Sequence, residues 1–268
     1  MRRCAVVLGW VLAMSALLPA VAVADGLYEA RSIVTGMDER SRPDGFRRAL
    51  GLVLVKVSGN PALDADSRLT GVDLGPLLRG FVYLDRMSDI PKHDEQGSRD
   101  RPYDLVVRFD PAAIDGLLRS WGDAAWPVPR PLLAVDVTIF PRRGDAMPLR
   151  ADTDSDERHR GALLAAAERF GLEVLIPARL PPVLAAPRDV ARLQGVLRWS
   201  DADAGWVAAW RLEWAGGVRE WGVRGVGFDA AYRDGVGGVA AVLSGEGSGR
   251  PVRPARLHRG PCQDASIC

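Results

Sequence analysis

The sequence predicts an α/β (α+β) protein with two small mixed-sheet domains, each backed by helices. Some segments repeat apolar residues with the period of a helix, others alternate them with the period of a strand, and both kinds occur before and after residue 126. Between the two groups, residues 126–131 (WPVPRP) carry a proline at every second position, which is typical of a stiff connection between domains. We therefore expect a first domain at residues 25–126, a proline-rich linker at 127–131 and a second domain at 132–245.

The first domain is expected to contain a strand, two helices, two further strands and a last helix. Its longest helix is indicated by apolar residues that share one helical face, namely Phe46, Leu50, Val53, Leu54 and Val57. Gly59 ends this helix, and Asp110 followed by Pro111 marks the start of the last one, as an N-cap and a first-turn proline. The other expected elements are a strand at 27–34, a short helix at 71–79, strands at 81–87 and 103–109, and a loop at 89–102.

The second domain begins with a largely apolar strand at residues 132–140, which we expect to be central in its sheet. Strands at 206–214 and 218–226 form a hairpin around a glycine-bearing loop. Asp229 is expected to cap a last helix with an apolar face, formed by Tyr232, Val236, Val239, Ala240 and Leu243. The other expected elements are a helix at 156–170, a short buried strand at 172–176 and a helical or mixed segment at 190–197.

Tryptophans are concentrated in the hairpin and form a candidate binding platform. Trp206, Trp210 and Trp214 lie four residues apart in one strand and therefore on one face, and Trp221 lies on the neighbouring strand. Exposed, these indoles would stack on a glycan or another flat ligand. Buried, they would supply apolar area beneath the last helix. The apolar face of that helix favours burial.

Residues 1–24 have the features of a cleaved signal peptide. Arg2 and Arg3 precede an uncharged apolar stretch, and residues 22–24 (AVA) fit the small-x-small rule for signal peptidase. The apolar stretch is shorter than the roughly 20 residues of a membrane span, so we expect cleavage before Asp25, a soluble product and a periplasmic location. The mature chain then carries a net charge of −1, against +1 for the full chain. This balance argues against a polyanion binder, because such a protein would need a clustered basic surface.

Two cysteines, Cys262 and Cys268, follow the second domain in a tail rich in Gly, Pro and Arg. We expect this tail, residues 246–268, to be disordered because it has little apolar pattern. In an oxidising compartment the two thiols can form a disulfide. Such a bridge would close a small ring in the tail without tying it to the core.

The sequence contains no motif that assigns a catalytic, cofactor-binding or metal-binding residue, and we expect no cofactor. Residues 225–230 match G-x-G-x-x-A, but the strand before them is the second arm of a hairpin, whereas a dinucleotide site needs a parallel strand. Residues 152–156 begin like an EF-hand loop that lacks the required glycine and the final glutamate. The histidines, His93, His159 and His258, have no metal-ligand spacing.

Three blocks of sequence resemble a family of exported bacterial proteins, domain of unknown function 2066 (DUF2066). The first is residues 27–30 (LYEA) with residues 49–50 (AL) and 53–60 (VLVKVSGN), and the second is residues 107–110 (VRFD) with Trp126 and residues 130–132 (RPL). The third is Trp221 with residues 228–233 (FDAAYR) and 243–245 (LSG). The resemblance covers most of residues 27–245. It implies export and the two-part fold, and it supplies no catalytic residue.

These observations favour a non-enzymatic, soluble periplasmic accessory or protein-binding factor of the cell envelope, with an envelope protein as its partner. The alternative is a periplasmic hydrolase that uses carboxylates, or a glycan-binding protein with exposed tryptophans. Paired acids in a cleft beside exposed indoles would favour the alternative. Buried indoles without such a cleft would favour the protein-binding factor.

Overall fold

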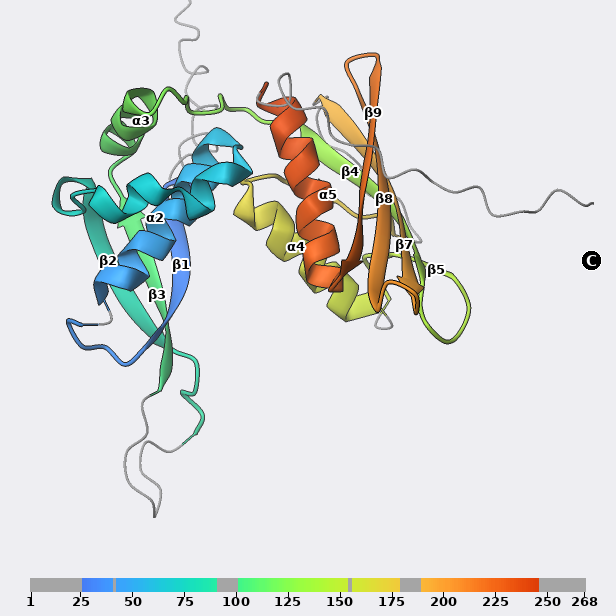
Figure 1. The fold of residues 1–268 in the computed structure, drawn as a ribbon, viewed down its shortest axis with the longest axis horizontal. Helices are drawn as coiled ribbons and strands as arrows, with labels where there is room; N and C mark the ends of the chain where they lie inside the picture. The colour runs from blue at the N-terminus through green and yellow to red at the C-terminus, as the bar shows by residue number, and fades with distance from the viewer. Residues whose placement is uncertain (1–25, 41, 91–100, 154–155, 179–188, 246–268) are drawn as a thin grey trace, which may run out of the picture.

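The computed structural model describes residues 26–40, 42–90, 101–153, 156–178 and 189–245, and it confirms the predicted fold class (Figure 1). The described residues form two sheets. The first has the strand order β1-β3-β2 and is antiparallel throughout, so only the second sheet is mixed. The second has the order β5-β4-β7-β8-β9, with β6 also paired to β4. The predicted signal peptide, the tail with Cys262 and Cys268, and His93 lie outside the described residues.

The first sheet and its helices come from the first half of the chain. The elements are β1 (Glu29–Thr35), α2 (Arg42–Ser58), β2 (Leu78–Asp85), β3 (Pro102–Phe109) and α3 (Pro111–Ser120). The predicted apolar face of α2 is buried, and Gly59 follows its end with a φ of 80°. Asp110 caps α3 as predicted, because its carboxylate accepts a hydrogen bond from the Ala113 N–H at 2.9 Å.

The short helix predicted at residues 71–79 is wrong in extent and type. The chain forms two 3-10 turns there, η2 (Ser67–Gly71) and η3 (Gly75–Leu77), after a first one, η1 (Pro61–Ala65), and β2 begins at once. Pro76 explains the difference, because proline lacks the backbone N–H and restricts the residue before it, so an α-helix cannot run through this point.

The second half of the chain forms the larger sheet and two helices. The elements are β4 (Leu132–Phe140), β5 (Met147–Pro148), α4 (Glu157–Arg169), β6 (Val174–Leu175), β7 (Val190–Ser200), β8 (Gly205–Trp214), β9 (Gly217–Val226) and α5 (Phe228–Leu243). β4 has paired strands on both edges, as predicted for a central strand. The hairpin turn is Ala215-Gly216, and both residues have a positive φ, which a two-residue type I′ turn requires.

Two predictions for the second half are wrong. Residues 190–197 belong to β7, since buried and exposed side chains alternate there with the period of a strand. The N-cap of α5 is Gly227, and Asp229 lies in the first helical turn, where its charge still complements the helix dipole.

The helices α4 and α5 lie side by side on one face of the larger sheet, between that sheet and the first half of the protein (Figure 1). α5 packs on β7, β8 and β9, while α4 packs on α5 and also reaches α2. Within the described ranges, no helix is both long enough and apolar enough to cross a bilayer. The arrangement leaves the opposite face of the larger sheet without a helix of the described residues on it.

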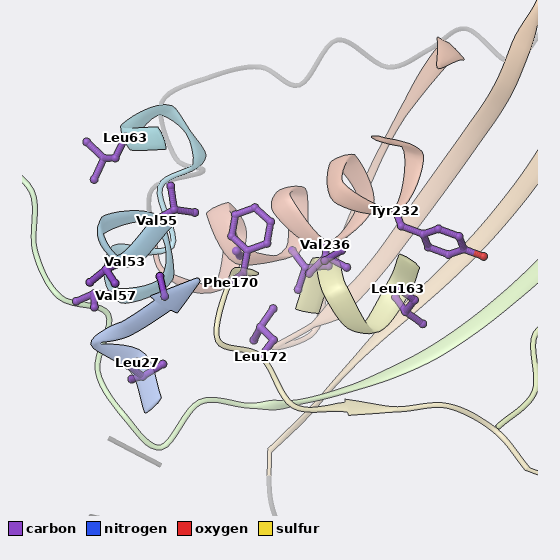
Figure 2. Close-up of a cluster of buried hydrophobic side chains, with 14 of the residues drawn as sticks. Leu27, Val53, Val55, Val57, Leu63, Leu163, Phe170, Leu172, Tyr232 and Val236 are labelled. Atoms are coloured by element: carbon purple, nitrogen blue, oxygen red, sulfur yellow. The ribbon is translucent and has the colours of Figure 1, made fainter. Parts of the chain in front are cut away.

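The cores of the two halves are continuous. Phe170, just after α4, lies between Val55 of α2 and Val236 of α5 (Figure 2). Gly237 makes room for the Phe170 ring, because a Cβ at residue 237 would lie 3.1 Å from its Cζ. The two sheets therefore share one apolar junction.

Arg130, in the predicted linker, is bonded to both halves. Its Nη2 donates to the Val57 carbonyl at 3.1 Å and its Nη1 to the Phe170 carbonyl at 2.7 Å, so it binds the ends of α2 and α4. The guanidinium lies 4.3 Å from the ring centre of Trp126. Burial lowers the pKa of Arg130 to about 10, which keeps it charged at neutral pH. This residue thus joins the two halves and is more than part of a spacer.

Candidate functional site

The open face of the larger sheet contains a hollow of about 330 Å³, which is the candidate functional site. Its floor is a row of small and medium side chains that the strand register places next to one another: Thr138, Val196 and Ala209. The next row forms a polar wall across the same strands: Asp136, Gln194, Arg211 and Glu220. These residues come from β4, β7, β8 and β9, so the hollow exists only when the four strands are paired.

Arg211 organises the charges of the wall. Its guanidinium contacts Glu220 across the hairpin at 3.2 Å and Glu213 on its own strand at 3.2 Å. The sequence predicts that Arg211 and Glu213 are exposed or paired across the hairpin; the pair of Arg211 with Glu220 confirms this for Arg211, whereas Glu213 pairs within its own strand. Asp136, at the other end of the wall, forms no ion pair with any described residue. The wall therefore presents a free carboxylate at one end and a bridged cluster at the other.

The two acids of this wall, Asp136 and Glu220, come from strands that are not neighbours. Asp136 is on β4 and Glu220 on β9, three strand spacings away, so their backbones are about 14 Å apart. Paired carboxyls in glycosidases lie about 5–10 Å apart. Glu220 and Glu213, which lies outside the wall, both accept hydrogen bonds from Arg211. Each of these two carboxylates therefore forms an ion pair with the Arg211 guanidinium.

The tryptophans of the candidate platform pack in or against the core, and two of them, Trp210 and Trp221, also belong to the residues that line the hollow. Trp210 and Trp221 are 2% and 5% exposed, and Trp206 and Trp214 are half-buried against the same core. The Trp210 ring lies 6.0 Å from that of Tyr232 on α5, and the Trp221 Nε1 donates to the Asp234 carbonyl at 3.3 Å. A stacking platform needs exposed ring faces, so this arrangement favours the packing interpretation for Trp210 and Trp221.

His159 is a second group of interest, and the sequence did not link it to any other residue. Its Nδ1 lies 3.2 Å from the Tyr232 hydroxyl, and its ring packs against Trp206 and Phe228. Burial lowers the pKa of His159, although the carboxylates of Asp156 and Asp229 oppose this effect and Arg158 adds to it. The long sequence separation of these residues explains why spacing alone could not reveal the cluster.

We expect His159 to make the stability of the protein depend on pH. The unfolded chain binds a proton at the ordinary histidine pKa of about 6.5, while the folded chain resists protonation. The resulting stabilisation is complete above that pH and is lost as the pH falls through the lowered pKa of the folded protein. Urea unfolding of the wild type and His159→Gln at about pH 7.5 and about pH 5.5 should show a larger loss at low pH for the wild type.

Comparing the wild type with His159→Gln subtracts the contribution of the other titrating groups to the pH dependence of stability. Burial raises the pKa of Asp234, which acts in the opposite direction because the folded state then holds its proton more tightly. Asp234 is present in both proteins and cancels. An equal loss of stability in the wild type and in His159→Gln would contradict the prediction.

The remaining sequence candidates form no site among the described residues. No group of three or more His, Cys, Asp or Glu side chains in those residues could hold a metal ion. Residues 225–230 contain the end of β9 and the start of α5, with Gly225 in a left-handed conformation. The loop with Asp152 and Asp156 is only partly described, and there the Asp156 carboxylate accepts from the Arg150 N–H at 3.0 Å and the Thr153 hydroxyl at 2.9 Å.

The hollow was not predicted from the sequence, although its residues occupy the outward positions of strands in which apolar and polar side chains alternate. Outward positions follow directly once residues 132–140 and 190–200 are known to be adjacent parallel strands. Because residues 190–197 were predicted as helical or mixed, Gln194 and Val196 were not recognised as outward positions of a strand. Periodicity identifies the outer face of a strand, but strand order, which the sequence leaves open, decides which outer residues become neighbours.

Comparison with known proteins places one family match on the first half of the chain. The family, described as Domain of unknown function (DUF8605), matches residues 20–127. A solved structure titled "Crystal structure of uncharacterized protein" is similar at 13% identity and a TM-score of 0.23, covering 46% of this chain and 95% of that chain. A TM-score at this level carries no argument about fold or function. No curated protein matches the chain.

The family match corrects the resemblance to DUF2066, which is wrong. The segment that suggested DUF2066, residues 53–60, serves the packing and termination of α2. Val53 and Val57 are buried, and the Ser58 hydroxyl donates to the Leu54 carbonyl at 2.7 Å. Gly59 has a positive φ. These features occur wherever an amphipathic helix ends against a sheet, so they do not distinguish one family from another.

Proposed function

We propose that the protein is an exported, non-catalytic factor of the periplasm that binds a protein partner of the cell envelope through the hollow on its larger sheet. The single observation that carries the proposal is the hollow itself, a row of small side chains beside a charged wall on the face opposite α4 and α5. The features of residues 1–24 support export.

The shape of the hollow supports a protein partner over a small molecule. Sites for small molecules have volumes of about 300–1,000 Å³ and bury most of the ligand surface. This hollow has a volume of about 330 Å³ and lies on one sheet face, with Val196 in its floor 41% exposed. A protruding side chain of a partner can enter it while the surrounding sheet contacts the rest of the partner.

The charges of the wall indicate what the partner should present. Asp136 supplies a carboxylate that forms no ion pair with the described residues, and Glu220 supplies one that already contacts Arg211. A basic side chain of the partner would complement Asp136, while an uncharged one would fit over Thr138 and Ala209. Complementary charges of this kind increase the specificity and the association rate of a complex more than its affinity.

A photo-crosslinking amino acid placed at Val196 tests the proposal. We expect it to form a discrete adduct with one protein in intact cells, whereas the same amino acid at Leu164, a 46% exposed residue of α4, should not form that adduct. Adding Ala209→Arg should reduce the Val196 adduct by about tenfold, because the long side chain fills the hollow.

The stability of the Ala209→Arg variant provides the control. Because residue 209 lies on the open face, its free energy of unfolding should remain within about 0.5 kcal/mol of the wild type. If the adduct also forms from Leu164, or if Ala209→Arg leaves it unchanged, the hollow is not the binding surface.

A further inference from the structure

The two edges of the three-stranded sheet differ in how their backbone groups are used. The Phe109 N–H donates to the Tyr28 carbonyl, so the alternate residues Glu29 and Ile33 point their carbonyls away from β3. Both carbonyls accept hydrogen bonds from α2: Lys56 Nζ donates to Glu29 at 2.9 Å, and Arg48 Nη2 to Ile33 at 3.0 Å. Side chains of the same chain therefore occupy the free edge of β1.

The edge formed by β2 has no such protection among the described residues. The Arg86 N–H donates to the Pro102 carbonyl of β3, so Phe81, Tyr83 and Asp85, at the odd positions, direct their backbone groups outward. β2 ends the strand order of its sheet, and none of the described residues donates to these outward carbonyls. Proteins normally protect such edges, because unpaired strand groups are a template for another strand.

The side chains of β2 are apolar on both faces of the sheet. Val82 and Leu84 on one face are 48% and 46% exposed, and Phe81 on the other is 40% exposed. The Phe81 ring contacts those of Phe46 and Tyr83 edge to face, at 5.0 Å and 5.8 Å between ring centres. The edge therefore combines backbone groups that bond to no other described residue with a row of aromatic side chains at the boundary of the sheet.

We propose that β2 pairs antiparallel with β2 of a second copy of this chain, which joins two three-stranded sheets into one of six strands. With the two-fold axis at Val82, the outward residue Phe81 lies opposite Tyr83 of the second copy. In the same register Arg79 lies opposite Asp85 of the second copy, so the strand is complementary to itself in charge. Both charges already have partners within the chain, Asp110 and Arg101, and pairing would extend these ion pairs.

Sedimentation equilibrium of the purified protein tests the proposal, and we expect a monomer–dimer equilibrium. Val82→Lys should raise the dimer dissociation constant about tenfold, which corresponds to about 1.4 kcal/mol. The two introduced ammonium groups would face each other across the axis, where like charges are unfavourable. Val82→Glu should act in the same way, while an equimolar mixture of the two variants should associate as tightly as the wild type.

Ile33→Lys is the matched control. Ile33 lies on the same face of the sheet, is 55% exposed and belongs to the strand whose edge is already bonded. It should leave the dissociation constant unchanged. A monomeric wild type at all concentrations would overturn the proposal. Equal weakening by Ile33→Lys would also overturn it, because the copies would then pack through the sheet face and not through the β2 edge.

Discussion

Replacing Trp210 by alanine is expected to lower the free energy of unfolding by about 3–5 kcal/mol. The indole is 2% exposed and lies between the larger sheet and α5, where it contacts Tyr232. Its Nε1 has no hydrogen-bond partner among the described residues, so packing accounts for its contribution. The loss is a large share of the 5–15 kcal/mol typical of native proteins. Chemical denaturation should show a much lower midpoint, or the variant should fail to accumulate.

Trp210→Phe is the control for this prediction. Phenylalanine keeps most of the apolar volume, and the N–H that it removes has no hydrogen-bond partner among the described residues, so the loss should be smaller than that for alanine. If Trp210→Ala were within about 1 kcal/mol of the wild type, the stripe would not be core. A stable variant that had also lost binding to glycan fragments would support the ligand-platform interpretation.

Replacing Gly235 by alanine is expected to destabilise the protein by about 2 kcal/mol. A Cβ at this position of α5 would lie 2.5 Å from Trp210 Cε2. On the other side of the same ring, a Cβ at Gly195 of β7 would lie 2.3 Å from Trp210 Cζ3. The indole is therefore confined between two glycines and cannot move away from an added methyl group. Thermal unfolding should detect the change as a clear decrease in Tm.

Gly161→Ala should change the stability in the opposite direction and make the protein more stable. Gly161 is an exposed residue of α4, and a Cβ there would meet no atom within 4 Å. Alanine in an exposed helix position stabilises by about 0.5–1 kcal/mol, because glycine loses more conformational entropy on folding. The pair of variants separates helix propensity from packing. A stabilising Gly235→Ala would show that α5 does not press on the Trp210 ring.

The sequence by itself determined the elements whose signals are local. The helix at Arg42–Ser58 follows from one apolar stripe and a terminal glycine, and the α3 cap follows from Asp110 and Pro111. The glycine-bearing loop and the alternating side chains of residues 206–214 predict the hairpin of β8 and β9. Each of these signals acts over a few residues, so it can be recognised without knowing the tertiary contacts of the segment.

Only the tertiary structure decided the features that depend on neighbours distant in sequence. Residues 190–200 form a strand because they pair with β4 on one side and with β8 on the other. The hollow needs four strands in one order. The environment of His159 needs a strand residue, Trp206, and two residues of α5, Phe228 and Tyr232, the last of them 73 residues further along the chain. The sequence places Arg130 in a linker, and only the structure shows its hydrogen bonds to the Val57 and Phe170 carbonyls. The free energy of each of these arrangements comes from contacts between segments, and a linear pattern does not specify which segments meet.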